Sequence, residues 1–422
     1  MQTIFVAAPG FQSIDAWLPL AIKHKESSND DIFIVFPYPW VLELIPECDA
    51  LVRIMVDNNF RVVCKFMPLE FFVVFENLTY LIKYVRMIEH FKSALIRKRL
   101  VRKTIFGRMK SFQKGISAMS CFRTIRTFKF DSEGVMVWDI LNLNPEPYKR
   151  LQSLIVKTKL WKRISINVGS IYVEDVSKDA LDSTSRDYQV SFSKQQTMLM
   201  TSQYGLENSH IIESKVPKFE QTWIEYLESY SLLDYRFLGS YALLVSRGED
   251  PPLLERVQRI SVLEEVINQI CEKRKMLLLI KLHPNERQGS FELDIEQIAK
   301  RDVVGKEAIS RVLLVHDHVI VAAKHAKYGF AYYSSTVADM VRVGCPAIQV
   351  LPILPTDSQS LVKSKLLFDL GFIELVPTID SLSNVLKNID NDRDLIKTAQ
   401  VKAWSNYFCS TSEFSISDFT EN

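Results

Sequence analysis

Short β-rich runs alternate with amphipathic segments along both halves of the chain, and no other feature of the sequence restricts the possible folds as strongly. In the first half, the runs at 3–9, 32–37 and 61–66 are too short to form independent helices. Residues 14–24, between the first two runs, carry apolar side chains at helical spacing. This strand–helix–strand rhythm is typical of a parallel sheet covered by helices.

The second half repeats the rhythm more regularly. Residues 253–274 are strongly amphipathic and predict a long helix, and residues 335–344 predict a shorter one. The predicted strands of this half are the apolar runs at 239–246, 276–284, 311–317, 329–335 and 346–352. Each half therefore predicts an α/β unit of its own.

The length of 422 residues favours the same division, because it exceeds what one ordinary hydrophobic core supports. We expect an α/β fold of two Rossmann-like domains that face a central cleft, with ligands bound at the carboxyl ends of the strands. The first domain is predicted at 1–230, with a basic, helix-rich insertion at about 68–120, and the second at 231–385. We expect the C-terminal helix, within 386–422, to pack back on the first domain.

The composition points to a cytoplasmic protein. The overall charge indicates no partner, because 52 Lys and Arg residues nearly balance 50 Asp and Glu residues. The six cysteines lie far apart and fit no zinc site, which favours a reducing compartment without disulfides. The first residues do not resemble a signal peptide, and no run reaches the roughly 18 apolar residues that span a bilayer. Any membrane contact is therefore expected to be peripheral, on the inner face of the cytoplasmic membrane.

The stretch LLLIKLHPNER at 277–287 reads as a buried strand that ends in polar residues. His283 stands at the carboxyl end of this strand and Pro284 stops it, so we expect the imidazole to point into the cleft. There the ring can donate a hydrogen bond to a phosphate oxygen, and Lys281 adds positive charge nearby. The alternative is a surface histidine without a ligand.

The stretch YYSSTVADMVRVGCP at 332–346 joins a buried strand to a helix through three hydroxyl side chains, Ser334, Ser335 and Thr336. These hydroxyls can cap the helix, or they can bind a phosphate together with the amides of the helix N-terminus. Both roles stay open at this point.

Arg247 and Gly248 follow the first predicted strand of the second half. The glycine permits a tight turn, and the arginine can hold a phosphate or a sugar carboxylate through two hydrogen bonds. A solvated turn is the alternative interpretation.

The order of these motifs resembles that of a known group of enzymes. KLHP at 281–284, followed about fifty residues later by SST and a helix closing on GCP, is similar to the HP and S(S/T) motifs of bacterial surface-polysaccharide transferases of the GT-B type. That group includes sialyltransferases and polysialyltransferases, Kdo transferases of capsule assembly, and CDP-glycerol glycerophosphotransferases. The resemblance covers chiefly 240–350, and it implies that His283 and the hydroxyls of 334–336 bind the phosphate of a cytidine nucleotide.

The first half offers a candidate for the catalytic base. Asp131, Ser132, Glu133 and Gly134 follow the predicted strand at 124–130, and a glycosyl transfer needs a base to take the proton of the acceptor hydroxyl. The sialyl- and Kdo transferases carry a (D/E)(D/E)G motif that supplies this base, although serine occupies its first acidic position here. The resemblance therefore implies Glu133 as the base, with Asp131 second, and both are expected to face the cleft. An acidic turn without a catalytic duty is the alternative.

No DxD motif stands where it could hold a divalent metal, which favours a monophosphate leaving group bound without metal or cofactor. We therefore predict a glycosyltransferase that moves an acidic sugar of the sialic acid or Kdo type from a CMP-activated donor to a glycan or glycolipid during bacterial surface-polysaccharide synthesis. The first alternative is a phosphotransferase that uses CDP-glycerol or CDP-ribitol to build a capsule or teichoic-acid-like polymer. The second is a non-catalytic assembly protein that binds polyanions or membranes.

Residues 83–129 are rich in Lys and Arg and interleave basic with apolar side chains at near-helical spacing. A basic amphipathic helix is typical of a membrane surface or of polyanion binding, although it can also be a solvated face. Both uses suit an anionic glycan acceptor or a lipid-linked one. Nucleic acid is not expected, because the chain has no zinc finger or aromatic RNA-binding pattern and its overall charge is balanced.

Overall fold

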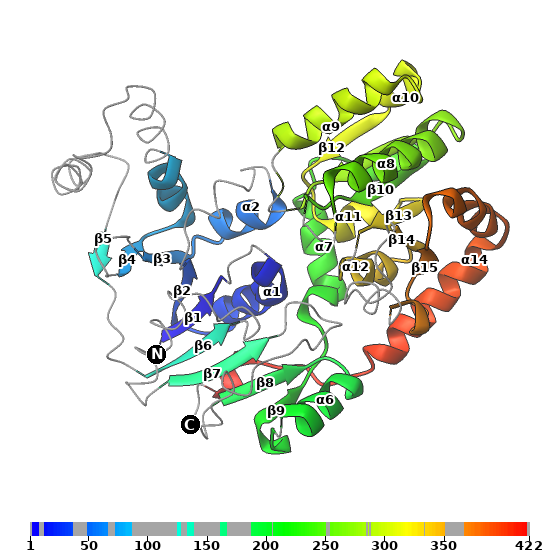
Figure 1. Ribbon diagram of the computed structural model, residues 1–422. Coiled ribbons are helices and arrows are strands. Elements are labelled where there is room, and N and C mark those ends of the chain that lie inside the picture. Colours follow the sequence, from blue (N-terminus) through cyan, green and yellow to red (C-terminus); the bar gives the residue numbers. More distant parts are fainter. Residues whose placement is uncertain are drawn as a thin grey trace.

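The computed structural model describes residues 2–7, 12–36, 49–65, 72–86, 125–127, 133–138, 161–166, 187–204, 206–249, 254–283, 286, 288–332, 334–350 and 367–419. These residues form two α/β domains, each built on its own sheet, and Figure 1 shows the two domains side by side. The predicted fold class, α/β with two Rossmann-like domains, is confirmed.

The sheet of the first domain has the strand order β5-β4-β3-β2-β1-β6-β7-β8-β9 over the described residues. Neighbouring strands run parallel except at β4, which is antiparallel to both of its neighbours. The chain leaves the central β1 in one direction through β2 and in the other through β6. The strands are β1 (Gln2–Val6), β2 (Asp31–Phe36), β3 (Arg61–Lys65), β4 (Phe72–Phe75), β5 (Ile125–Thr127), β6 (Gly134–Trp138), β7 (Trp161–Ile166), β8 (Asp187–Ser191) and β9 (Ile211–Glu213).

The helices of this domain pack on the sheet through apolar side chains, as α1 illustrates. In α1 (Gln12–Ser27), Trp17 packs on Phe5 of β1 with ring centroids 5.2 Å apart, and its indole N–H donates to the Val6 carbonyl. The side chain of Asp49 accepts a hydrogen bond from the Leu51 amide and so caps the next helix. The remaining helices are α2 (Ala50–Asp57), a helix at 78–86, α6 (Lys194–Tyr204) and the short η4 (Asn208–His210).

The expectation of a helix-rich segment at about 68–120 is wrong at its beginning. Phe72–Phe75 forms strand β4, because this segment pairs with β3 on one side and β5 on the other. A helix follows only at 78–86. Residues 87–124 lie outside the described part of the chain, so most of the basic segment 83–129 does too.

The sheet of the second domain is parallel throughout its described part, in the order β12-β11-β10-β13-β14-β15. Its strands are β10 (Tyr241–Val245), β11 (Leu277–Lys281), β12 (Val312–Val315), β13 (Tyr328–Ala331), β14 (Ala347–Val350) and β15 (Glu374–Val376). Its described helices include α8 (Arg256–Ile267), which continues into a π-helical turn, η7 (Asn268–Glu272), α9 (Gln288–Arg301), α10 (Lys306–Ile309), α11 (Val319–Ala323), α12 (Val337–Arg342), η8 (Ile379–Ser381) and α14 (Leu382–Tyr407).

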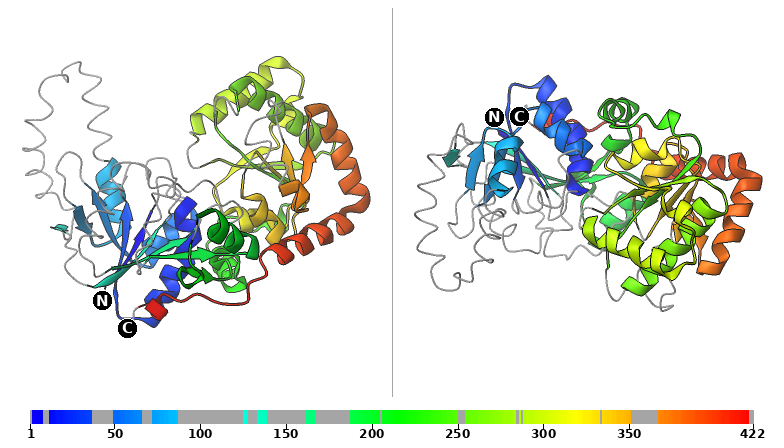
Figure 2. Two further views of the ribbon diagram at one scale, coloured as in Figure 1. Left: turned by 60° about the horizontal axis from the view of Figure 1, so that its bottom comes forward. Right: turned by 90° about the horizontal axis from the view of Figure 1, so that it is seen from above.

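Two segments join the domains. The first contains η5 (Pro217–Phe219), α7 (Gln221–Ser229) and η6 (Tyr235–Phe237) and leads from the first sheet into the second. The second is the end of the chain, which leaves α14 and returns to the first domain at η9 (Ile416–Phe419), as Figure 2 shows. There Phe419 packs on Tyr188 with ring centroids 4.8 Å apart, and the Lys215 amide donates to the Ser412 carbonyl. The chain thus crosses between the domains twice.

Candidate active site

Three loops that carry predicted ligand-binding residues meet at one edge of the second sheet. β10 lies between β11 and β13, and all three strands run parallel, so their carboxyl ends share an edge. The chain passes from β10 through β11 to β12 and then returns to the other side of β10 as β13. Open α/β sheets bind ligands at such a switch point. At the usual strand spacing, the ends of β11 and β13 lie about 10 Å apart.

His283 lies two residues beyond the end of β11 and is half-buried. Its backbone carbonyl accepts a hydrogen bond of 2.8 Å from the Glu286 amide, which closes a tight turn. Pro284 lies outside the described residues. The structure therefore places His283 at the carboxyl end of a central strand.

A buried cluster of charged residues lies behind this turn. Arg259 of α8 forms ion pairs with Glu286 and with Asp294 of α9, and all three side chains are almost fully buried. Glu286 also accepts a hydrogen bond from Ser246, the residue that follows β10. Burial raises the pKa of Glu286, and Arg259 and Ser246 oppose that rise. The cluster ties the loops after β10 and β11 to two helices.

Ser334, Ser335 and Thr336 follow β13 and are half-buried. The Ser334 hydroxyl oxygen accepts hydrogen bonds from the Thr336 amide, at 3.3 Å, and from the Thr336 hydroxyl, at 2.8 Å. Two of the three hydroxyls therefore stabilise the local turn. α12 is shorter than predicted, since it begins at Val337, and Gly344 follows its end with a positive φ of 74°.

Arg247 and Gly248 follow β10 and are half-buried. Gly248 has no positive φ, and a Cβ added there would meet nothing closer than Glu286 Cβ at 3.9 Å. The backbone at this position therefore does not require a glycine. Arg247 stands beside the switch point, between the loops that carry His283 and Ser334.

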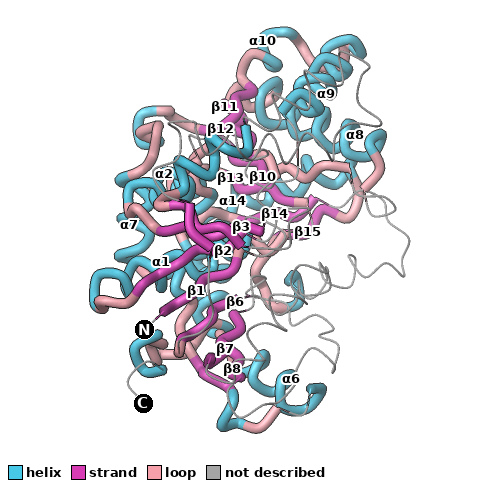
Figure 3. Tube along the Cα trace, turned by 90° about the vertical axis from the view of Figure 1, so that its left-hand side faces the viewer, coloured by secondary structure: helices cyan, strands magenta, loops and turns pink. Residues whose placement is uncertain are grey.

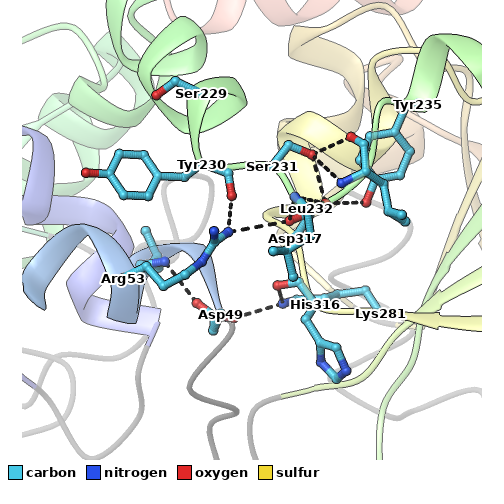
Figure 4. A network of polar contacts seen from close by, with 12 residues as sticks. Asp49, Arg53, Ser229, Tyr230, Ser231, Leu232, Tyr235, Lys281, His316 and Asp317 are labelled. Carbon is cyan, nitrogen blue, oxygen red and sulfur yellow. Dashed lines mark hydrogen bonds and ion pairs between the residues drawn. The ribbon is translucent and has the colours of Figure 1, made fainter. Parts of the chain in front are cut away.

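Lys281 contributes to the contact between the domains. Its ammonium lies 2.9 Å from Asp49, at the start of α2, and donates to the His316 carbonyl at 2.9 Å. Figure 4 shows this pair beside Arg53, which donates to the Tyr230 carbonyl. The Lys281 charge is thus shared with a carboxylate of the other domain.

Asp317 is the buried centre of the same boundary. Its carboxylate accepts hydrogen bonds from the Ser231 hydroxyl at 2.8 Å, the Leu232 amide at 3.0 Å and the Tyr235 hydroxyl at 2.9 Å. Arg53 of the first domain lies 3.9 Å from it. These contacts fix the connecting segment after α7 against the loop that follows β12.

A second buried cluster between the domains contains residues that the sequence analysis did not select. His318 Nε2 lies 2.8 Å from Asp15 Oδ1, and Lys218 Nζ lies 3.1 Å from Asp15 Oδ2 and 2.8 Å from Asp339. Asp15 and Asp339 stand in the first turns of α1 and α12, and His318 caps α11. We call these four residues the junction cluster. The sequence carries only a weak signal for this cluster, which is that Asp15 and Asp339 lie near the starts of helices, where acidic residues are favourable in any protein.

The charged groups of the junction cluster shift one another's pKa values. Burial alone would raise the pKa of Asp15, but His318 and Lys218 outweigh it and hold this pKa well below its ordinary value. Burial lowers the pKa of Lys218, and Asp15 and Asp339 raise it above the usual range. Burial also raises the pKa of Asp339, against the effect of Lys218. Asp15 and Lys218 are therefore ionised, and Asp339 is the carboxyl that most readily takes up a proton.

His318 holds one defined tautomer. Its Nδ1 accepts a hydrogen bond from the Ile320 amide, so Nε2 carries the proton that lies toward Asp15. Burial lowers the pKa of His318, but Asp15 raises it by more. A second proton would have to bind Nδ1 and break the helix cap, which favours the neutral ring.

The predicted position of Glu133 is wrong. Glu133 precedes the first residue of β6, and its carbonyl accepts a hydrogen bond from the amide of Gln2, the first residue of β1. It is exposed at the amino edge of the sheet, and Figure 1 shows this end of β1 pointing away from the second domain. Glu133 thus stands at the start of one strand, at the edge of the sheet opposite to the one predicted. Asp131 lies outside the described residues.

Comparison with known proteins gives likeness in structure only. No protein-family model matches the chain, and no curated protein matches it in sequence. A putative UDP-N-acetylglucosamine 2-epimerase from Listeria monocytogenes has a TM-score of 0.53 at 10% identity, over 96% of this chain and 92% of that chain. The S. aureus MnaA–UDP structure has a TM-score of 0.52 at 10% identity, over 98% of both chains.

A variant of the wall teichoic acid polymerase TagF is similar to the same degree. Its TM-score is 0.52 at 12% identity, over 98% of this chain and 85% of that chain. At such identities the likeness establishes the fold, which is the two-Rossmann α/β architecture of the GT-B type. Among the described residues, no helix has the length and apolar character needed to cross a membrane.

Proposed function

We propose that the protein is a glycosyltransferase of GT-B architecture that binds a nucleotide-activated donor at the carboxyl ends of β10, β11 and β13. The observation that carries the proposal is the meeting of three loops at one switch point. His283, Arg247 and the hydroxyl-rich segment 334–336 belong to neighbouring parallel strands, although they are far apart in sequence. An imidazole, a guanidinium and hydroxyl groups suit the oxygens of a phosphate.

The donor we propose is a CMP-activated acidic sugar of the sialic acid or Kdo type. A single phosphodiester needs less compensating charge than a diphosphate, which fits one arginine and one histidine at the switch point. The carboxylate of an acidic sugar would give Arg247 a second partner. This choice of donor rests on the sequence motifs and on the chemistry of these side chains.

The likeness to TagF favours a second candidate, a transferase of polyol phosphate from a CDP-activated donor. It would use the same histidine and hydroxyls, but the acceptor would attack phosphorus instead of an anomeric carbon. A third outcome is binding of UDP, which the S. aureus MnaA structure contains. Nucleotide preference separates the three.

Isothermal titration with CMP, CDP and UDP tests the proposal. We expect CMP to bind most tightly, and we expect the His283→Ala variant to lose about tenfold or more in CMP affinity, because a charge-assisted hydrogen bond to phosphate contributes about 1.5–3 kcal/mol. His325→Ala is the matched control, since His325 is exposed in the same domain and precedes β13 at the opposite edge of the sheet.

The other possible outcomes of the nucleotide titrations lead to different conclusions. Preference for CDP would select the polyol-phosphate transferase, and preference for UDP would select a UDP-sugar enzyme. Equal nucleotide affinity in the wild type and His283→Ala would overturn the proposed site. The absence of any thermal shift with millimolar nucleotide would overturn the enzyme assignment, because a ligand that binds only the native state must stabilise it.

A further inference from the structure

A pocket of about 680 Å³ lies in the first domain, and none of the donor-loop residues lines it. It is formed by α2, the helix at 78–86 and the end of α7, and we call it the α2 pocket. Figure 3 shows α2 and α7 next to each other, in agreement with the hydrogen bond from the Asn58 side chain to the Tyr226 hydroxyl. The volume is within the range of small-molecule sites in proteins, roughly 300–1,000 Å³.

The side chains that line the α2 pocket combine the groups that bind saccharides. Tyr230 supplies an aromatic ring, Thr79 and Ser229 supply hydroxyls, and aliphatic side chains of both helices supply apolar surface. An aromatic ring covers the apolar face of a sugar, while hydroxyls exchange hydrogen bonds with its edge. A purely apolar ligand would leave the hydroxyls and charges of this lining without compensation.

The charge of the lining favours an anionic saccharide. Arg53 and Lys83 are its two cations, and Asp57 is its one acid. The Tyr230 hydroxyl donates to Asp57, so part of that negative charge is already compensated inside the pocket. Lys83 is exposed, and the Arg53 guanidinium lies 5.8 Å from the centre of the Tyr230 ring. A carboxylate placed between the two cations would gain from both.

The α2 pocket is also near the donor loops. Arg53 lies one helical turn from Asp49, about 6 Å along α2, and Asp49 contacts Lys281 at 2.9 Å. Lys281 precedes His283 by two residues, which span at most about 7 Å. One helical turn and one ion pair therefore connect the pocket to the strand that carries His283, so an oligosaccharide of a few residues can reach from one site to the other.

We propose that the α2 pocket binds an acidic sugar residue of the acceptor chain, with Lys83 and Arg53 as the groups that recognise its carboxylate. The role as an acceptor site rests on the proposed glycosyltransferase function, but binding of an anionic saccharide does not. Lys83 is the better residue for a test, because Arg53 also contacts Tyr230 and Asp317 at the domain boundary.

The test uses the full-length protein and a short oligomer of sialic acid as the probe, with a chitin oligomer of equal length as the neutral reference. We expect the sialic acid oligomer to bind more tightly than the chitin oligomer and its binding to weaken with added salt, since the cations are near solvent. Lys83→Glu should raise the dissociation constant about tenfold or more, while Lys83→Arg should retain binding. Lys194→Glu, an exposed lysine in α6, is the matched control.

Titration of each variant with CMP separates this inference from the proposed function. Unchanged CMP affinity in Lys83→Glu, together with weaker oligomer binding, would support a distinct acceptor pocket. Equal oligomer affinity in the wild type and Lys83→Glu would overturn the pocket, as would CMP binding without any oligomer binding. Oligomer binding that depends on Lys83 in a protein that binds no nucleotide would leave the pocket standing and overturn the transferase.

Discussion

Asp15 is held by two hydrogen-bonding partners, the Lys218 ammonium and the His318 imidazole, from segments more than two hundred residues away in the chain. Lys218 belongs to the segment that joins the domains, and His318 follows the last strand before the chain crosses the second sheet. Buried charges are retained only when each has a partner, because desolvation costs several kcal/mol per ion. The junction cluster therefore requires the relative position of the domains that the structure shows.

The first prediction concerns Asp15. We expect Asp15→Asn to lower the free energy of unfolding at neutral pH by about 3 kcal/mol, because it leaves Lys218 and His318 without their shared partner. The folded-state pKa of Asp15 is lowered, so its stabilisation is complete above the unfolded value of about 4 and is lost as the pH falls below it. Urea denaturation at several pH values should show the difference between the wild type and the variant shrinking in acid.

The matched control is Asp31→Asn, which removes an exposed ion pair with Arg61. It should cost less than about 1 kcal/mol, as exposed pairs usually do. A difference between Asp15→Asn and the wild type that stays constant down to strongly acidic pH would contradict the assigned pKa direction.

The second prediction concerns Glu133. Because this side chain is exposed at the amino edge of β6, we expect Glu133→Gln to keep its turnover within about twofold of the wild type, a change in the barrier below about 0.5 kcal/mol. Turnover is measured with the donor that the nucleotide titrations select. A loss of turnover of about 100-fold would instead identify Glu133 as the general base. It would contradict the conclusion that Glu133 lies far from the reacting groups.

At the scale of elements, the donor loops are supported from behind by α8 and α9. Arg259 of α8 holds Glu286, and Glu286 in turn holds Ser246, so one buried arginine connects the loops after β10 and β11. A site on loops is precise only when such contacts fix the loops. Arg259, Glu286 and Asp294 are buried and contact one another, which explains why no ligand-binding motif marks them in the sequence.

The third prediction tests this support. We expect Glu286→Gln to weaken CMP binding about tenfold, since the neutral amide loses the ion pair with Arg259 while Arg259 keeps Asp294 and the helices stay packed. The measurement is a nucleotide titration with circular dichroism as a check on folding. Glu272→Gln, which changes a half-buried glutamate paired with Lys275 at the end of η7, should bind CMP like the wild type. Equal affinity in both variants would show that the loops do not need the cluster.

At the scale of the whole molecule, the domains are joined by the connecting segment, by the returning C-terminus and by polar contacts across the boundary. Asp317 collects three hydrogen bonds from the connecting segment and lies near Arg53 of the first domain. Lys281 and Asp49 form a separate cross-domain pair. These polar contacts stand beside apolar packing, because one hydrophobic cluster contains buried residues of both domains and of the connecting segment.

The fourth prediction concerns this boundary. Asp317→Ala should lower stability by about 3 kcal/mol, because the buried partners of the carboxylate lose their acceptor, and it should broaden or split the thermal transition as the domains unfold less cooperatively. Differential scanning calorimetry measures both effects. Asp234→Ala, which removes an exposed carboxylate of the same connecting segment, should change little. A sharp transition at wild-type temperature in Asp317→Ala would contradict the role of Asp317.

Strand and helix positions could be predicted from sequence where the pattern is local. Residues 276–280 are apolar at consecutive positions, as a strand buried on both faces requires, and β11 forms at Leu277–Lys281. The two Rossmann-like domains were also predictable, because the chain length and the repeated alternation of strands and helices can be read directly from the sequence. The segment around Phe72 shows the limit, since β4 is a strand because of its partners β3 and β5.

The sequence by itself determined the strands and helices of the regular alternating repeat, such as β11, and it placed His283 and Ser334 at strand ends, because period and punctuation act between near neighbours in the chain. Only the tertiary structure decided that β10 separates β11 from β13, that Glu133 lies at the amino edge beside Gln2, and that Asp15 meets Lys218, His318 and Asp339. The physical reason is that strand order and burial depend on which distant segments pack together. No local pattern of side chains carries that information.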